Sequence, residues 1–531
     1  MLATVNVDFN SEIKNLMSTK LINDNKEILK NHLGNLYRIL SKDNEAQKQR
    51  SDLLNHSKGT RKRKIQWAIK RYEKAINLFF PVIISSPNDV AAIFNHKRFD
   101  YVVIDEASQV TLERALPILY LGNTRIISGD KQQLQPTDFF QSKLKEEYEE
   151  TYSDDDASVI NDTSDIQDSN SLLEYVEKKY HIEMLTYHYR SSKRELIQFS
   201  NVVFYDGQLV VANSPKDNKP GIEIVDVNGL WDGKTNIFEA KKIVEKIKSI
   251  CSKPHHGSIG VITFNINQKN LIDSLIEQEN DANINKELNR KKENGEDESL
   301  FVKNLENVQG DERDIIIFSL TYAKQGDGSF SQRFGPINQK AGENRINVAV
   351  SRAKNKIYIF KSIKASSIAR AGQSKGRQVF HDYVEYVELF AKSNDLESKE
   401  IKSLFNRYLN TSEEKNDIEQ THRFDSPFEE DVYHEIFNKL DTKKYKIETQ
   451  IQQSGYRIDL AIKELKTGNF VLAIECDGHQ YHHANQMQKD NDFYRQNYLE
   501  NRGWAFYRID SWKWYRSDRN KIVQEILKKL L

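Results

Sequence analysis

Two adjacent carboxylates, Asp105 and Glu106, follow the apolar segment 99–104. β-Branched and aromatic residues dominate this segment, which predicts a strand that ends where the two acids begin. Nucleotide-hydrolysing folds use such a strand end to hold Mg²⁺ and to place a water molecule. Asp105 is therefore a candidate Mg²⁺ ligand, and Glu106 is the candidate that orients the attacking water. Two neighbouring carboxylates also occur on ordinary surfaces, so this assignment depends on the motifs that accompany the pair.

A second group of carboxylates lies near the C-terminus, on segments that we expect to be strands. Glu475 and Asp477 are two residues apart within 471–477, so their side chains share one face of that strand. Asp459 belongs to the preceding predicted strand, 457–462, and can converge with them on one divalent ion. Hard oxygen ligands suit Mg²⁺ or Mn²⁺, which would activate water and stabilise a pentacovalent phosphate. The chemistry predicted for this group is metal-dependent phosphodiester cleavage.

Alternating strand-like and helical segments position both groups. Short β-branched runs separated by helical patterns predict an α/β fold with parallel sheets and crossover helices. The predicted strands include 81–84, 99–104, 125–128, 259–264, 314–320 and 356–360, and the polar stretch 279–299 is expected to be a loop. The predicted domains are a helical N-terminal stalk (1–80), the C-terminal part of a first α/β domain (81–180) with an acidic insertion (146–170), a second α/β domain (181–390), a linker (391–424) and a compact final domain (425–531).

Composition narrows the class of protein. Lysine plus arginine and aspartate plus glutamate both number 78, so global charge does not indicate a nucleic-acid partner, although local basic grooves could still dock phosphates. Two cysteines, Cys251 and Cys476, are too few for a disulfide framework or a cysteine-based zinc site. No apolar run approaches the roughly 20 residues that cross a bilayer. The segment Met1–Val5 lacks the pattern of a secretory signal. We expect a cytoplasmic protein with no membrane partner.

Six motifs occur in a fixed order: Asp105–Gln109, Gly129–Pro136, Tyr189-Arg190, Phe264-Asn265-x-x-Gln268, Gln309–Glu312 and Asn347–Ala353. This set resembles the superfamily 1 helicases, of the branch that includes the Upf- and Dna-type enzymes, and it implies two RecA-like domains and ATP as the nucleotide. The resemblance implies that Gln133 senses the γ-phosphate and that Arg190 and Arg352 are arginine fingers. It places Gln268 in the fourth motif. Glu312 falls in a motif that contacts the nucleotide sugar and the nucleic-acid backbone.

From about residue 70 to residue 531, the chain also resembles the C-terminal portion of large bacterial helicase–nuclease proteins. The stretches that carry this resemblance include Ser86-Pro87, Phe99-Asp100, His188–Ser191, Phe199–Asn201, Phe204-Tyr205 and Asn304–Asp314. The final domain is similar to the very-short-patch repair endonucleases of the PD-(D/E)xK superfamily, on Gly455–Ala461, Ile474–Gly478, Tyr481-His482, Asp492, Arg495 and Gly503-Trp504. This similarity implies a restriction-endonuclease-like α/β domain that acts on DNA.

The phosphate-binding loop of the helicase pattern is missing. Such a loop has the form GxxxxGK[ST], and its amides cradle phosphates while its lysine neutralises them. Upstream of Asp105 the only glycines are Gly34 and Gly59, and neither opens such a loop. The segment Gly229–Thr235 has three residues between its glycines instead of four, and it follows Arg190 in the chain. We therefore expect the first RecA-like domain to be incomplete.

The nuclease pattern also lacks a residue, because Asp477 stands where the (D/E)xK pair has its lysine. His482 or His479 could supply the proton transfer, since histidine titrates near neutral pH. Glu429 and Gln450 could complete the metal shell. The alternatives are a nuclease fold that has lost activity, and a zinc site in the histidine-rich run 479–483.

Three functions follow from these patterns. The first is a superfamily 1 helicase core coupled to a metal-dependent DNA endonuclease in bacterial defence or repair. In the second, the helicase core is a non-hydrolysing platform that binds nucleic acid, and only the nuclease is catalytic. In the third, a partner chain supplies the P-loop half and restores ATP hydrolysis in trans.

Overall fold

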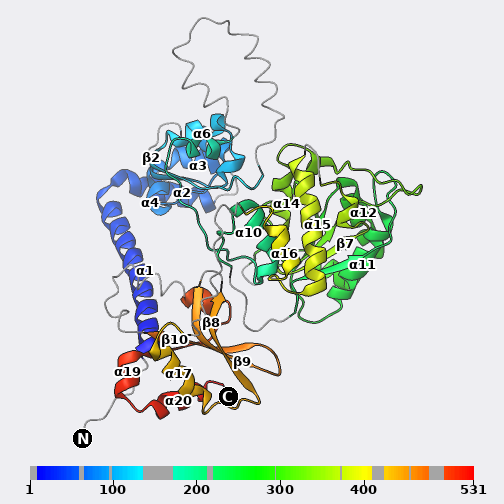
Figure 1. The fold of residues 1–531 in the computed structure, drawn as a ribbon. Coiled ribbons are helices and arrows are strands. Elements are labelled where there is room, and N and C mark those ends of the chain that lie inside the picture. Colours follow the sequence, from blue (N-terminus) through cyan, green and yellow to red (C-terminus); the bar gives the residue numbers. More distant parts are fainter. Residues whose placement is uncertain are drawn as a thin grey trace, which may run out of the picture. The chain divides into compact units, whose positions relative to one another are not determined.

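A computed structural model describes residues 9–58, 65–94, 99–134, 171–211, 219–292, 295–370, 374–409, 424–453, 456–477 and 496–530. The chain divides into two compact units (Figure 1). One comprises residues 1–130 and 135–180, and the other comprises residues 131–134 and 181–531. The predicted acidic insertion, 146–170, lies outside the described residues.

The first unit combines helices with a small parallel sheet. Its N-terminal helices are α1 (Phe9–Lys42), α2 (Asn44–Lys58), α3 (Ile65–Arg71) and α4 (Glu73–Phe79). The strands β1 (Phe99–Ile104) and β2 (Gly122–Ile127) pair in parallel. The remaining described helices are α5 (Pro87–Ile93), α6 (Leu112–Leu119) and α9 (Leu172–Glu177), with a 3-10 turn at Ala107–Gln109. A core that includes Ile104, Leu112 and Leu172 joins the sheet to these helices.

The segment 81–84, which the sequence predicts as a buried strand, is not a strand. It has no strand assignment, and the side chains of Val82 and Ile84 are 77% and 95% exposed. A strand needs a neighbour for its backbone hydrogen bonds. Within the described part of this unit, β1 and β2 pair only with each other, and the segment 81–84 does not join their sheet.

The second unit contains a five-stranded sheet in the order β3-β7-β6-β4-β5, and every pairing in it is parallel. The strands are β3 (Ile222–Asp226), β4 (Ile259–Thr263), β5 (Phe301–Asn304), β6 (Arg313–Ser319) and β7 (Ala353–Lys361). The α/β class with parallel sheets is thus confirmed. Both faces of the sheet carry a buried core, which is the normal condition of a parallel sheet.

Helices supply the partners of both cores. The helices α11 (Ile237–Cys251), α12 (Ile266–Glu279) and α13 (Ala282–Glu287) contribute to one core. The other core includes residues of α10 (Gln198–Tyr205), α14 (Gly342–Val350), α15 (Lys375–Ser393) and α16 (Lys399–Phe405). Short 3-10 turns lie at Arg194–Leu196, Gly335–Asn338 and Ala365–Ser367.

The stretch 279–299 is not the plain loop that its polarity predicts. It contains α13, where the Asp281 side chain accepts hydrogen bonds from the amides of Asn283 and Ile284. Ile284 is fully buried against α11 and its neighbours. A single well-placed apolar residue and an N-cap are enough to dock one helical turn, and average polarity does not reveal them.

A second sheet in this unit has the order β11-β10-β9-β8. Its strands are β8 (Tyr445–Gln453), β9 (Tyr456–Glu464), β10 (Phe470–Asp477) and β11 (Phe506–Asp510). The first three strands are antiparallel, and β11 joins β10 in parallel. The helices α17 (Pro427–Phe437), α19 (Ser511–Arg516) and α20 (Arg519–Lys528) pack with this sheet around the buried Trp514. Among the described residues, no helix is both long and apolar enough to span a membrane.

Candidate functional site

The first carboxylate pair lies in a tight loop at the end of β1. Asp105 is exposed, and its Oδ1 accepts hydrogen bonds from the Glu106 amide at 2.9 Å and from Ser128 Oγ at 2.6 Å. Glu106 has a left-handed backbone, with φ of 53°. A Cβ on Gly129 would lie 3.0 Å from the amide nitrogens of Ala107 and Ser108, so glycine lets the loops after β1 and β2 approach closely. The Asp105 carboxylate is thus held at an open strand end.

Gln133 lies in the second unit, beside α14. Asn344 Nδ2 donates to the carbonyls of Lys131 at 3.1 Å and of Gln133 at 2.8 Å. Asn347 Nδ2 donates to the carbonyl of Gln132 at 2.7 Å. Asn347, which begins the last helicase-like motif, and Asn344 of the same helix therefore hold the backbone of residues 131–133. The predicted role of the Gln133 side chain remains a prediction.

Arg190 and Glu312 meet in the second unit, as members of one motif set should. Arg190 Nε lies 2.6 Å from Glu312 Oε2, and Lys354 Nζ lies 2.8 Å from Glu312 Oε1. Burial opposes ionisation of Glu312, but hydrogen bonds and charge from Lys354 and Arg190 outweigh burial and lower its pKa to about 2. Arg352 is 2% exposed and donates to the carbonyls of Val348 at 2.7 Å and of Asp311 at 3.4 Å.

Gln268 lies in a buried polar network around Glu239, and the contacts given for its side chain are structural. Its Oε1 accepts from the Asn236 amide at 2.8 Å, and its Nε2 donates to the Asn236 carbonyl at 3.0 Å. Glu239 Oε1 accepts from Ser319 Oγ at 2.6 Å and from the Thr321 amide at 2.7 Å. Burial raises the pKa of Glu239 to about 7 against these hydrogen bonds. The nucleotide role of Gln268 stays a prediction.

The glycine-containing segment 229–235 joins β3 to α11, and two of its amides already donate to a carboxylate of the same segment. Asp232 Oδ1 accepts from the amides of Lys234 at 2.8 Å and of Thr235 at 2.6 Å. Its Oδ2 accepts from Thr235 Oγ1 at 2.8 Å. A carboxylate therefore occupies two of the donors that a P-loop would present to phosphate.

The three predicted metal ligands, Asp459, Glu475 and Asp477, lie on the neighbouring strands β9 and β10 of the C-terminal sheet. Leu460 of β9 lies opposite Ile474 of β10, so Asp459 and Glu475 follow at the same level of the sheet. Asp459 Oδ2 accepts a hydrogen bond from the Cys476 amide at 2.8 Å. Glu475 is 8% exposed. Burial raises the pKa of the Cys476 thiol. The negative charges of four carboxylates raise it further, in the order Asp459, Glu429, Glu475 and Asp477.

Glu429 and Gln450 extend this cluster. Gln450 on β8 has a left-handed backbone with φ of 53°, and its Nε2 donates to Glu429 Oε2 at 2.7 Å. Burial, reinforced by the charge of Asp459, raises the pKa of Glu429 to about 7. The amide oxygen of Gln450 is buried and accepts no hydrogen bond from the described residues. An oxygen without a donor beside several carboxylates suits a divalent cation.

The cluster contains one cation that the sequence analysis missed. Arg508 on β11 lies opposite Glu475 in the parallel register. Its Nη1 is 3.5 Å from Asp477 Oδ1, and its side chain is 12% exposed. The available signal was a single basic residue within the strand Phe506–Asp510. The histidines proposed for the missing lysine, His482 and His479, lie outside the described residues, as does the run 479–483 of the zinc alternative.

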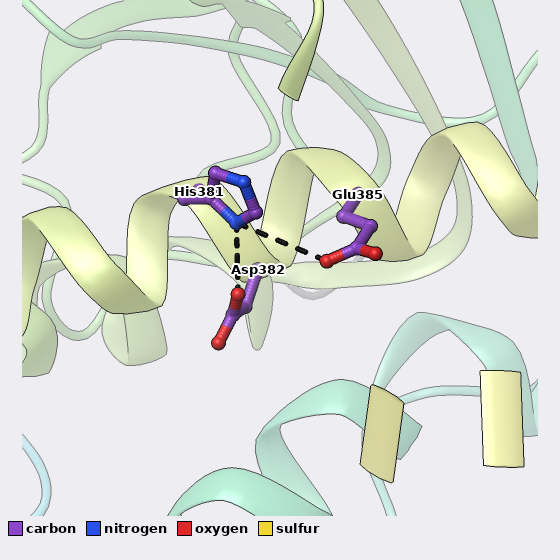
Figure 2. Close-up of side chains that lie close together, drawn as sticks. All are labelled: His381, Asp382 and Glu385. Carbon is purple, nitrogen blue, oxygen red and sulfur yellow. Dashed lines mark hydrogen bonds and ion pairs between the residues drawn. The ribbon is translucent and has the colours of Figure 1, made fainter. Parts of the chain in front are cut away.

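A third group of possible ligands, His381, Asp382 and Glu385, lies on α15 (Figure 2). His381 Nδ1 is 2.8 Å from Asp382 Oδ1 and 3.8 Å from Glu385 Oε2. Arg370 Nε donates to Asp382 Oδ1 at 2.8 Å, and Arg407 Nη1 donates to Glu385 Oε2 at 2.6 Å. Two guanidinium groups already neutralise these carboxylates, so the cluster is an ion-pair network that ties α15 to its neighbours.

Three family models match successive parts of the chain. One family model described as an AAA domain (AAA_11) matches residues 3–140, and a second AAA domain model (AAA_12) matches residues 169–364. The family model REase_MTES_1575 matches residues 428–530.

Curated relatives are much longer than this chain. The "Uncharacterized ATP-dependent helicase MG140 homolog" of Mycoplasma pneumoniae is 33% identical over 473 residues, which are 87% of this chain and 40% of the relative. The ATP-dependent helicase MG140 of Mycoplasma genitalium is 37% identical over 348 residues, 64% of this chain and 30% of the relative. The DNA replication ATP-dependent helicase/nuclease DNA2 of Gallus gallus is 25% identical over 284 residues, 50% of this chain and 23% of the relative. The chain thus carries helicase domains of the superfamily 1 type, followed by a nuclease-like domain at its C-terminus.

Proposed function

We propose that this protein is a nucleic-acid processing enzyme whose independent chemistry is metal-dependent endonucleolytic cleavage of DNA. The observation that carries the proposal is the placement of Asp459, Glu475 and Asp477 on the neighbouring strands β9 and β10, where Asp459 accepts a hydrogen bond from the Cys476 amide. The match of residues 428–530 to a REase model and the similarity to a DNA helicase/nuclease support the same reaction class.

The donor set fits a hard divalent cation, Mg²⁺ or Mn²⁺. Asp459, Glu475 and Asp477 would hold the ion, and the buried oxygen of Gln450 is an orphaned acceptor beside them. When bound, such an ion activates water and neutralises charge on a phosphate. Arg508 would add a second positive charge on the side of Asp477, in place of the missing lysine. Because a guanidinium does not lose its proton, we assign it charge stabilisation and leave proton transfer to His482.

Cleavage assays test the nuclease directly. The purified chain is incubated with plasmid DNA, single-stranded DNA and RNA, in MgCl₂ or MnCl₂. We expect DNA cleavage that falls roughly 100-fold or more in Asp459→Asn, because the ion loses a charged ligand. Glu430→Gln is the matched control, since Glu430 neighbours Glu429 on α17 but is 56% exposed. No cleavage in either metal, or full cleavage by Asp459→Asn, would overturn the proposal.

We propose that the helicase core binds nucleic acid and hydrolyses ATP only with a partner chain that supplies a P-loop. Asp105 would then bind Mg²⁺, Glu106 would orient water, and the nucleotide would meet Gln133, Arg190, Gln268, Glu312 and Arg352. The occupied amides of segment 229–235 support the need for a separate P-loop. A non-hydrolysing platform that delivers DNA to the nuclease is the second candidate, and the same observation favours it.

The biological role that we infer is defence or repair of a bacterial genome, supported by the resemblance to bacterial helicase–nucleases. Expression of the chain in a bacterial host tests this role. We expect higher survival after phage infection or DNA damage than with the Asp459→Asn variant. Equal survival of the two strains under both challenges would contradict it.

A further inference from the structure

The C-terminal domain contacts the loop that carries Arg190. Tyr498 Oη donates to the carbonyl of His188 at 3.0 Å, and Arg502 Nη2 donates to the same carbonyl at 2.9 Å. Arg502 Nη1 also donates to the carbonyl of Ser191. All the acceptors are backbone oxygens, so these two side chains hold the main chain on both sides of Arg190 rather than the arginine itself.

The contacting side chains sit on a firmly anchored element. Residues 496–501 are helical, and the spacing of four between Tyr498 and Arg502 places them on one face. Leu499, on another face, is fully buried in a core with Trp504. The rings of Tyr187 and Tyr498 meet edge to face, with centroids 5.4 Å apart. A shift of this helix therefore requires either loss of its own core or movement of the Arg190 loop.

The loop is closed on itself and tied to β7. His188 Nε2 accepts a hydrogen bond from the Ser191 amide at 3.0 Å. Ser191 Oγ donates to the carbonyl of Ala353 at 3.0 Å, and the Ser192 amide donates to the carbonyl of Lys354 at 2.7 Å. The loop thus joins β7 beside Lys354, which also pairs with Glu312. Because these hydrogen bonds hold the loop backbone, they also hold the Cα atom from which the Arg190 side chain extends.

We propose that Tyr498 and Arg502 are positioning residues through which the C-terminal domain holds Arg190 on Glu312. The nuclease-like domain and the nucleotide side of the second RecA-like domain would thereby be coupled, and such coupling acts in both directions. Any effect of this coupling on ATP rests on the proposed function, because the assignment of Arg190 to a phosphate is part of that proposal. The contacts themselves do not depend on it.

Hydrogen exchange on the full chain tests the proposal without any activity assay. Tyr498→Phe/Arg502→Ala should speed exchange of the His188 and Ser191 amides roughly tenfold or more, because the loop then opens locally. Arg502→Lys should give an intermediate rate, since an ammonium group can still donate to one carbonyl. Arg516→Ala is the control, because Arg516 is exposed on α19 and lies over the Trp512 ring.

Titration of His188 supplies a spectroscopic readout in the same variants. Burial first, and then the charges of Arg190, Arg502 and Arg352 in that order, together lower the pKa of His188 to about 3. Loss of the Arg502 charge should raise this pKa in labelled-histidine NMR, and Arg516→Ala should leave it unchanged. If the double variant misfolds, Tyr498→Phe and Arg502→Gln, of which the second also removes the charge, are measured singly. Unchanged amide exchange and an unchanged His188 pKa in folded Arg502 variants would overturn the proposal, while DNA cleavage could persist or fail independently.

Discussion

Arg508 and Asp477 illustrate how single side chains set the character of the nuclease-like site. Asp477 occupies the position where the (D/E)xK pattern has its lysine. Arg508, on the adjacent strand β11, places a positive charge beside Asp477. The charge of Arg508 acts in two directions. At the proposed metal site it would compete with the metal ion for Asp477, and it would add positive charge beside a bound phosphate.

Replacing Arg508 with glutamine should separate these two effects. We expect cleavage to fall roughly 100-fold, because one preorganised charge on the phosphate is lost. Mn²⁺ affinity, measured by calorimetry without DNA, should stay equal or increase, because Asp477 loses its competing partner. Arg516→Gln is the control and should change neither quantity. Weaker Mn²⁺ binding together with lost cleavage would indicate a merely structural arginine.

At the scale of elements, two buried carboxylates hold helices of the second unit in place. Asp382 on α15 is fully buried and binds Arg370, His381 and Tyr408. Burial opposes its ionisation, but these partners prevail and lower the pKa of Asp382 to about 2. Glu239 on α11 also accepts four hydrogen bonds, yet burial dominates there and raises its pKa to about 7. The two carboxylates should therefore affect the stability of the domain in different ways.

Asp382→Asn should lower the free energy of unfolding of this domain by about 3 kcal/mol. The substitution removes a buried negative charge and leaves its cationic partners without that charge. Denaturant titration, followed by hydrogen exchange of the β6 amides, measures this loss. Glu400→Gln is the control, since Glu400 is exposed on α16. A variant as stable as the control would contradict the structural role assigned to this cluster.

The raised pKa of Glu239 predicts that its contribution to stability depends on pH with the opposite sign to that of a salt-bridged acid. Its pKa is raised from 4.5 to about 7, so the folded protein binds more protons than the unfolded chain between these values. Stability from this group is full below pH 4.5 and is lost as pH rises through 7, by about 3 kcal/mol in total. Glu239→Gln should remove this slope in β6 exchange protection between pH 5.5 and 8. Glu245→Gln, 63% exposed on the same helix, should keep it.

At the scale of the whole molecule, the sequence of this chain contains no GxxxxGK[ST] motif before Asp105. We expect the purified chain to hydrolyse ATP no faster than its Glu106→Gln variant, because no P-loop lysine neutralises the phosphates. A phosphate-release assay with single-stranded DNA present measures this rate. Turnover that is lost in Glu106→Gln would contradict the prediction. Activity that appears only when a P-loop polypeptide is added would favour the split enzyme over the platform.

Much of the fold followed from local pattern. The strands at 99–104, 259–264 and 314–320 were predictable because each is a β-branched run followed by a helical segment, and parallel sheets demand such runs. The segment 81–84 has a similar composition but pairs with no strand among the described residues. The helix α13 forms within a stretch that is polar on average. Both errors arose because strand pairing and helix docking are tertiary events that a local window does not contain.

By itself, the sequence determined which acids could do chemistry, since Asp105, Asp459 and Glu475 stand at positions where strand periodicity and motif order single them out. Only the tertiary structure brought Arg508 beside Asp477, joined Gln450 to Glu429 by a hydrogen bond, and set Tyr498 and Arg502 on the Arg190 loop. The physical reason is the same in each case. Such contacts join residues that are distant in the chain, and their distances depend on the sheet register and on how separate elements pack.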